Sequence, residues 1–261
     1  MTSLLVVERT TAMHRVNPVA KLLAALTIAI VLVLTIDVVS AGVALAVEAL
    51  LLPFAGVRPR TFWIRTAPVW IAAPLAALTI ALYGQPGGTV HFSWFLIHVS
   101  DGSLHLALAT SLRVLAIGLP SVVLFITIDP TDLADGLAQV LHLPSRFVLG
   151  ALAGMRLVGL FAQDWQALEA ARRARGVADR GRIRRFLGMA FALLVLSVRR
   201  GSKLATAMEG RAFGAPVRRT WARESRFGAA EWTVVAAGLL IAALAVVVSV
   251  ATGSWNFIGA R

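Results

Sequence analysis

Two short segments of the chain place an arginine between small residues. They read Ala174-Arg175-Gly176 and Gly210-Arg211-Ala212, with the two arginines 36 positions apart. A guanidinium group is planar and always charged, and it binds carboxylates or carbonyls through two parallel hydrogen bonds. With little bulk beside it, such an arginine can enter a groove on a partner protein. The alternative is that these arginines only belong to a basic cytoplasmic segment, some of which bind anionic lipid headgroups.

Histidine and aspartate spacing provides a weak signal for a metal site. His98 and His105 stand on either side of Asp101 at intervals that one helix would group together. They lie where a loop meets an apolar segment, and polar and aromatic residues gather at such interfaces in any case. Ligand spacing alone is weak evidence, so we assign no metal site to the chain.

A row of acids provides the main alternative function. Asp129, Asp132 and Asp135 recur at three-residue spacing and would share one stripe of a helix. Clustered acids at a membrane face are what a membrane-embedded enzyme acting on lipid or isoprenoid substrates would need. Acids are also favoured in the first turns of any helix, because they interact well with the helix dipole.

The composition indicates a membrane protein with a basic part. Hydrophobic residues make up 58% of the 261 positions and charged residues 15%, against roughly 25% charged in soluble domains, and the mean hydropathy is +0.80. Lys and Arg number 25 against 13 Asp and Glu, giving a net charge of +12. With no cysteine in the sequence, disulfides, thiolate metal sites and a cysteine nucleophile are excluded.

Apolar runs predict five transmembrane helices, since a bilayer core of about 30 Å needs roughly 20 helical residues. The first run is followed at once by a second, which favours a membrane anchor over a cleaved signal peptide. The fold class that we expect is an all-α integral membrane protein. The predicted spans lie near residues 19–36, 38–57, 67–83, 105–128 and 231–251.

The distribution of basic residues predicts the orientation in the cell membrane. The loop 84–104 contains no Lys or Arg, whereas 129–230 contains 17 of the 25. Because basic segments stay in the cytoplasm, we expect the N-terminus and 129–230 to be cytoplasmic. The predicted organisation is a transmembrane bundle over 1–128, a cytoplasmic domain over 129–230 and a C-terminal transmembrane helix within 231–261.

The cytoplasmic domain is predicted to contain three helices. Asp129 before Pro130 is typical of a helix start, with the aspartate as N-cap and the proline in the first turn. Ser145 is expected to cap a second helix, over about 146–175, which ends at Gly176. A third helix is expected from about Arg182 to between Arg211 and Gly214. Its apolar stretch 186–198 is too short to span comfortably, which favours an interfacial or partner-facing helix.

Two charges fall inside the predicted spans. Glu48 and Arg113 lie at similar counted depths, about 14–15 Å from the outer surface at 1.5 Å per residue. Charges near the middle of a bilayer are costly unless they are paired. We therefore expect a Glu48–Arg113 ion pair.

The two arginine segments resemble the paired signatures of one transporter family. The stretch from Glu169 to Gly176 is similar to the first Ala-Arg-Gly signature of the transmembrane T component of energy-coupling factor (ECF) transporters, the EcfT/CbiQ family, and 207–214 is similar to the second. Residues 14–21 and 129–134 also resemble the family. The second signature reads Gly210-Arg211-Ala212, which moves the glycine and leaves the local helix ending open.

The resemblance implies a non-catalytic, energy-coupling scaffold in a four-part importer. Two cytoplasmic ATPase subunits, which use ATP and Mg, would dock at the coupling helices, and a separate membrane S component would capture a vitamin or a transition-metal ion. The chain itself would need no cofactor and would bind no nucleic acid. In agreement, the sequence contains no G-x-x-x-x-G-K-[ST] motif. The docking residues implied are Ala174, Arg175, Gly176, Gly210, Arg211 and Ala212.

Overall fold

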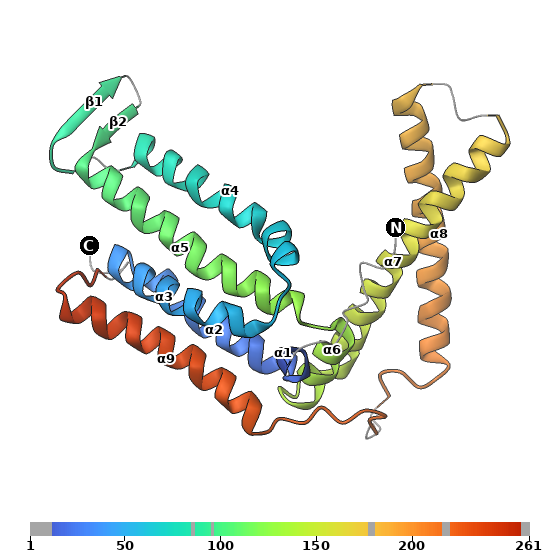
Figure 1. Cartoon of the computed structure of the whole chain (residues 1–261). Helices are drawn as coiled ribbons and strands as arrows, with labels where there is room; N and C mark the ends of the chain where they lie inside the picture. Colours follow the sequence, from blue (N-terminus) through green and yellow to red (C-terminus); the bar gives the residue numbers. More distant parts are fainter. Residues whose placement is uncertain (1–11, 85–86, 95–96, 177–180, 216–219, 257–261) are drawn as a thin grey trace. The chain divides into compact units, whose positions relative to one another are not determined.

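The chain is almost entirely helical. A computed structural model describes residues 12–84, 87–94, 97–176, 181–215 and 220–256, and the all-α fold class is confirmed (Figure 1). The elements are α1 (Ala12–Arg15), α2 (Pro18–Leu34), α3 (Val38–Leu51), the 3-10 helix η1 (Leu52–Ala55), α4 (Pro59–Tyr83), β1 (Val90–Trp94), β2 (Ile97–Ser100), α5 (Asp101–Ile126), α6 (Pro130–Gln139), α7 (Ser145–Ala174), α8 (Arg182–Glu209) and α9 (Ala229–Ala251).

The structure divides into two compact units. One unit contains residues 1–136 and 225–261, and the other contains residues 137–224. The second unit is therefore narrower at both ends than the predicted domain 129–230. The C-terminal helix α9 packs with the N-terminal bundle, against α2 and α3.

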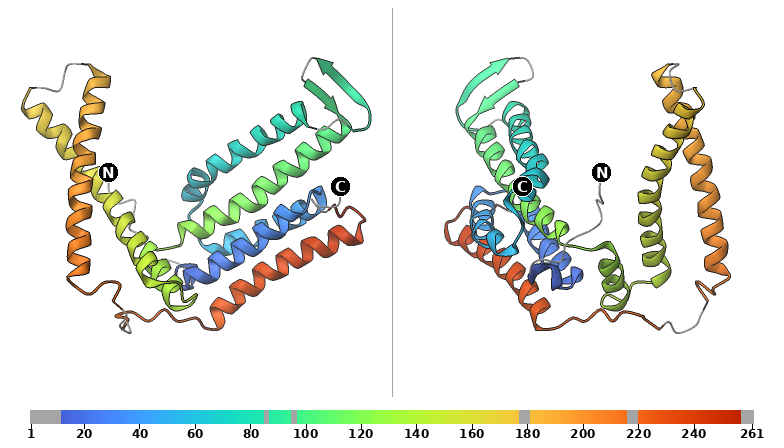
Figure 2. Two further views of the ribbon diagram at one scale, coloured as in Figure 1. Left: turned by 180° about the vertical axis from the view of Figure 1, so that it is seen from behind. Right: turned by 45° about the vertical axis from the view of Figure 1, so that its right-hand side comes forward.

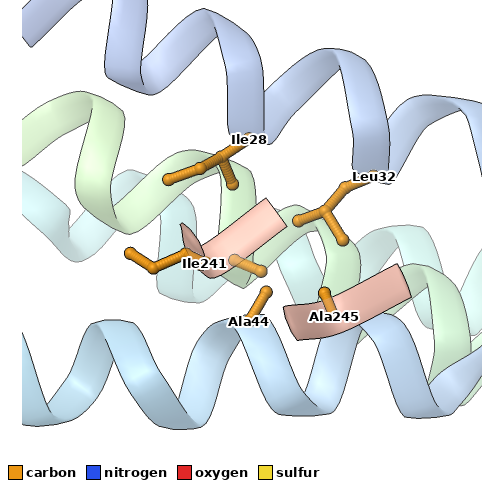
Figure 3. Packing of buried hydrophobic residues seen from close by; sticks show 6 residues of the cluster. Ile28, Leu32, Ala44, Ile241 and Ala245 are labelled. Carbon is orange, nitrogen blue, oxygen red and sulfur yellow. The ribbon is translucent and has the colours of Figure 1, made fainter. Parts of the chain in front are cut away.

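The first unit is a helix bundle built around small residues. In Figures 1 and 2, α2, α3, α5 and α9 run side by side, and α4 packs along α5. Gly238 of α9 permits a close approach to α2, because a Cβ atom there would lie 2.8 Å from the Cα of Ala24. The buried cluster at the centre draws on four helices (Figure 3) and consists of Ile28, Leu32, Ala44, Ala116, Ile241 and Ala245.

Large apolar side chains cover the outside of this bundle. Ile71 and Leu75 of α4 are 68% and 61% exposed, and Leu240 of α9 is 69% exposed. A soluble protein rarely exposes apolar area on this scale, whereas lipid covers it at no cost. The arrangement is that of an integral membrane protein.

Five of the described helices are long and apolar enough to cross a membrane, and four of them coincide with predicted spans. They are Val38–Ala55, α4, α5, α7 and α9, whereas α2 has 17 residues and falls below that length. The prediction that 19–36 is a span is thus not met in length, and the segment predicted as a cytoplasmic helix over about 146–175 is α7. By length and composition α7 also qualifies, with a mean hydropathy of 1.4 over its best window, against 2.8 for α9.

Helix boundaries differ from the prediction where polar residues begin or end a span. The span predicted at 67–83 begins at Pro59 instead, so that Arg60 and Arg65 lie on the helix. The span predicted at 105–128 begins at Asp101, where Ser100 and Ser103 form a reciprocal capping box. The loop between these helices contains the antiparallel hairpin of β1 and β2, which we did not predict.

The second unit is formed around the antiparallel pair α7 and α8 (Figure 2). Arg200 of α8 donates from Nη2 to Oδ1 of Asp164 at 2.9 Å, and its Nη1 lies 2.5 Å from Oδ2. Nearer the turn, Arg185 pairs with Glu169. Ser145 is the first residue of α7 and makes no side-chain capping bond, which corrects its predicted role.

Candidate functional site

The first arginine segment forms the end of α7. The helix ends at Ala174, Arg175 occupies the C-cap, and Gly176 has a left-handed φ of +67°. The Gly176 N–H donates to the carbonyl of Arg173 at 3.1 Å, which satisfies one of the last free helix carbonyls. The helix ending predicted at Gly176 is confirmed.

The second arginine segment ends α8 in the same way, with alanine in the place of glycine. After Glu209, residues Gly210 and Arg211 continue as a tight turn, and Ala212 has a left-handed φ of +57°. The Ala212 N–H donates to the carbonyl of Glu209, and the Phe213 N–H to that of Met208, both at 2.9 Å. These are the two bonds of a Schellman motif. The displaced glycine therefore leaves the helix ending intact.

The two ends match in detail. In each, an arginine stands directly before a left-handed residue whose N–H donates to the carbonyl three positions back. Arg175 and Arg211 are both exposed, and within the part of the chain that the structure describes neither side chain has a hydrogen bond or an ion pair. Both guanidinium groups therefore present their donors outward, beside Ala174 and Gly210, which add little bulk.

The two arginine ends lie far apart in the second unit. Arg175 directly follows the end of α7, before α8 begins at Arg182, and Arg211 follows the other end of α8. A helix of 28 residues is about 42 Å long at 1.5 Å per residue. One small groove cannot contain both ends, so the arrangement suits two separate partner sites.

The left-handed alanine gives a stability prediction. An alanine in this conformation costs about 1 kcal/mol relative to glycine, so Ala212→Gly should stabilise the end of α8 by about that amount. Gly176→Ala should cost about the same, because a Cβ at Gly176 would meet no atom within 4 Å and only the backbone is strained. Thermal unfolding of the purified variants measures both shifts, and a lower melting temperature for Ala212→Gly would contradict the assignment.

The predicted Glu48–Arg113 ion pair is not formed. Both carboxylate oxygens of Glu48 are buried without a hydrogen-bond partner, and Arg113 donates from Nη2 to the carbonyl of Thr35 instead. The depth count assumed that the two spans begin at one level. Since α5 begins at Asp101 and runs past the turn between α2 and α3, Arg113 is level with Thr35 rather than with Glu48.

Arg113 joins a buried polar cluster that sequence reasoning missed. Asp37 is 3% exposed and caps α3, accepting at 2.7 Å from the Ser40 N–H and at 2.8 Å from its hydroxyl. The Ser249 hydroxyl donates to Asp37 at 2.7 Å, and the charge of Arg113 acts on the same carboxylate. The cluster ties α9 and α5 to the turn between α2 and α3.

The other candidate residues serve local structure. Asp129 accepts a hydrogen bond at 2.7 Å from the Thr131 N–H, as expected for the N-cap of α6. Asp101 pairs with His91, at 2.6 Å between Oδ1 and Nε2. Among the described residues no three His, Cys, Asp or Glu side chains group as metal ligands.

Comparison with known proteins fits this geometry. A sequence model of the family described as CbiQ, cobalt transport protein, matches residues 9–222. The chain belongs to the CbiQ family. The recognition of the EcfT/CbiQ family in the sequence is thereby confirmed. The match includes α7, α8 and both arginine ends.

Three similar proteins share the name energy-coupling factor transporter transmembrane protein EcfT. The protein of Brevibacillus brevis is 28% identical over 165 residues, 59% of this chain and 62% of its own length. That of Limosilactobacillus fermentum is 23% identical over 225 residues, 81% and 84% of the two chains. That of Exiguobacterium sibiricum is 27% identical over 173 residues, 61% and 63%. The match thus spans less than two thirds of the first and third relatives.

These names describe transport components rather than enzymes. The chain described here is a multi-pass membrane protein of the CbiQ family. The acids at Asp129, Asp132 and Asp135 need no catalytic role, since Asp129 caps a helix and the other two have interaction partners of their own.

Proposed function

We propose that this CbiQ chain is the energy-coupling scaffold of an ECF-type importer. It links two cytoplasmic ATPase subunits to a substrate-binding membrane S component for uptake of a vitamin or a transition-metal ion. The pair of matched arginine ends on α7 and α8 supports this most strongly. Two equivalent arginine ends on one asymmetric chain suit a partner that is present in two copies.

Each exposed guanidinium would enter a groove on one ATPase subunit and bind carboxylates or carbonyls there. The residues that contact the subunits are Ala174, Arg175 and Gly176 at one end, and Gly210, Arg211 and Ala212 at the other. ATP and Mg are used by the ATPase subunits. When these close on ATP, the two tips move relative to each other, and α7 and α8 pass the displacement to the S component.

Exposed apolar side chains on these helices support a second, membrane-embedded partner. Phe186, Phe191 and Val198 of α8 are 59%, 67% and 61% exposed, and Phe147 and Val158 of α7 are 70% and 65% exposed. Such a surface needs an apolar cover. We assign it to the S component and to the bilayer interface.

Purification of the tagged chain from its native membrane tests the assembly. Two ATPase subunits and one small membrane protein should co-purify in stoichiometric amounts, and mass spectrometry of the small protein would identify the S component. Purification of the chain alone, with full recovery of folded protein, would contradict the proposal.

We further propose that the N-terminus and the second unit are cytoplasmic. The native chain has no cysteine, so single cysteines report topology without background. Gly87→Cys should react with a membrane-impermeant thiol reagent in intact cells, whereas Arg60→Cys and Arg173→Cys should react only after permeabilisation. Labelling of Arg173→Cys from outside would mean that α7 crosses the membrane and would overturn this orientation.

A further inference from the structure

Asn17, between α1 and α2, joins segments that are far apart in the sequence. Its side chain is 7% exposed, and Nδ2 donates to the Ser225 hydroxyl at 2.8 Å and to the carbonyl of Arg226 at 3.0 Å. Oδ1 accepts from the Val19 N–H at 3.0 Å and caps α2. The same side chain therefore begins a helix and holds a segment more than 200 residues away.

Glu231 fixes the other side of this junction. Its Oε1 accepts from the backbone N–H of Asn17 at 3.1 Å, and its Oε2 accepts from the N–H of Gly228 at 2.8 Å. One residue further, the Trp232 ring packs edge-to-face on Phe227 with 5.4 Å between ring centroids. The segment that leads into α9 is thus held by hydrogen bonds and by ring packing.

The chain also leaves the first unit beside Asn17. A Cβ atom at Gly136 of α6 would lie 2.9 Å from Oδ1 of Asn17, 2.7 Å from a methyl of Val19 and 3.5 Å from the Ser225 hydroxyl. Only glycine fits so close an approach. Gly136 is the last residue of the first unit before residues 137–224, and Ser225 is the first residue after them. The two ends of the first unit that flank residues 137–224 therefore lie next to each other.

One turn along α2, Lys21 extends the junction to the end of α5. It is fully buried, and its Nζ donates to the carbonyl and the hydroxyl of Thr127 at 3.1 and 3.0 Å. Thr127 is the C-cap of α5, directly before α6. A cation at a helix C-terminus is electrostatically favourable. The residues that lead out of the bundle are therefore anchored to α2 twice.

We propose that Asn17 is a positioning residue that ties both ends of residues 137–224 to the start of α2. Together with Gly136, Ser225, Arg226 and Glu231 it forms a clamp, which we call the Asn17 clamp. The inference rests on the proposed function, because its use is to transmit force from the arginine ends to the membrane bundle. With the clamp closed, a displacement of the coupling helices reaches α2 and α9. With the clamp open, residues 225–228 change conformation when the coupling helices move, and the displacement does not reach α2 and α9.

Asn17→Asp weakens the clamp and leaves the helix start intact. Aspartate caps a helix as well as asparagine does, so the bond from the Val19 N–H is kept. The donation to the Arg226 carbonyl is lost and two oxygens then face each other, while the Ser225 hydroxyl keeps its contact only by turning to donate. Gly136→Ala is a second, independent variant, since its methyl group would force α6 away from Val19 and Asn17. Thr27→Val is the matched control, because it removes one hydrogen bond of 2.8 Å from the same helix, to the carbonyl of Leu23.

The distance between two spin labels, one on each unit, tests whether the Asn17 clamp holds the two units in a fixed arrangement. Arg60→Cys and Ala205→Cys place one nitroxide on each unit, at exposed positions, in the full chain assembled with its ATPase subunits in nanodiscs. Asn17→Asp and Gly136→Ala should broaden the distance distribution and abolish its shift on ATP addition, while ATP hydrolysis stays that of Thr27→Val and both variants still purify as folded complexes. Distributions and ATP shifts equal to those of the control in both variants would overturn the proposal.

The same labels separate this proposal from the proposed function. If the unmutated chain carries no ATPase subunits, the proposed function fails. The distribution is then compared for the chain alone in nanodiscs, where the two clamp variants should still be broader than Thr27→Val. Equal widths there would show that Asn17 does not hold the junction.

Discussion

Replacing both Arg175 and Arg211 by alanine is expected to abolish ATPase co-purification and ATP-driven uptake while the membrane bundle still folds. Truncating one partner of a buried charged contact typically costs about 2–5 kcal/mol, or roughly 30-fold or more in affinity. The single variants should lose less, because the remaining arginine end still binds one subunit. Pull-down of tagged chain from membranes, with uptake measured in the same cells, reads both effects.

A matched pair of substitutions controls for the loss of charge. Arg173 lies in the last turn of α7, two residues before Arg175, and Arg199 lies inside α8; both are exposed. Arg173→Ala with Arg199→Ala therefore removes the same number of charges and leaves both docking arginines in place. This control should assemble normally. Lysine at positions 175 and 211 should restore little ATPase binding, since its ammonium group cannot form the two parallel hydrogen bonds of a planar guanidinium. Normal assembly of the double alanine variant would mean that the two arginines serve only as topogenic charge.

Asp37→Ala should destabilise the membrane bundle by about 3 kcal/mol, since removing one partner of a buried charged cluster leaves the other uncompensated. Three hydrogen bonds to the carboxylate would be lost, and Arg113 would keep the Thr35 carbonyl without its nearby counter-charge. One of these three bonds, from the Ser40 N–H, is the N-cap bond of α3. Thermal unfolding of the purified chain in detergent measures the effect.

Glu48 is the matched control in the same bundle. It is also 3% exposed, but neither of its carboxylate oxygens has a partner among the described residues. An unpaired polar group in an apolar interior costs free energy, so Glu48→Leu should stabilise the bundle by about 1–3 kcal/mol. A loss of stability as large as that of Asp37→Ala would contradict this account of the two carboxyl groups.

The start of α6 and the end of α7 were predictable because their signals are local. Asp129 before Pro130 identifies a helix start from two adjacent residues, and Gly176 identifies a helix end from its tolerance of positive φ. Ala212 shows the limit of such signals. Its left-handed conformation is set by the hydrogen bonds of Phe213 and Ala212 to the preceding turn, and alanine itself gives no indication of it.

Contacts between distant segments were not predictable from one sequence. The partner of Arg113 depends on where α5 begins, and the capping box of Ser100 and Ser103 shifts that start by four residues from the predicted 105. Nothing in the sequence near Asn17 indicates that its side chain binds Ser225 and Arg226. Span assignment from hydropathy has a similar limit. The helix α2 was predicted to span the membrane but is shorter than the other candidate spans, whereas α7 was predicted to be cytoplasmic but is long and apolar enough to span.

The central claim is that Arg175 and Arg211 each dock one ATPase subunit, and native mass spectrometry of the nucleotide-free complex tests it most directly. The unmutated chain should carry two ATPase subunits, Arg175→Ala and Arg211→Ala should each carry one, and the double variant should carry none. The pair Arg173→Ala and Arg199→Ala should keep both subunits. Two bound subunits on either single variant, or any subunit on the double variant, would contradict the claim.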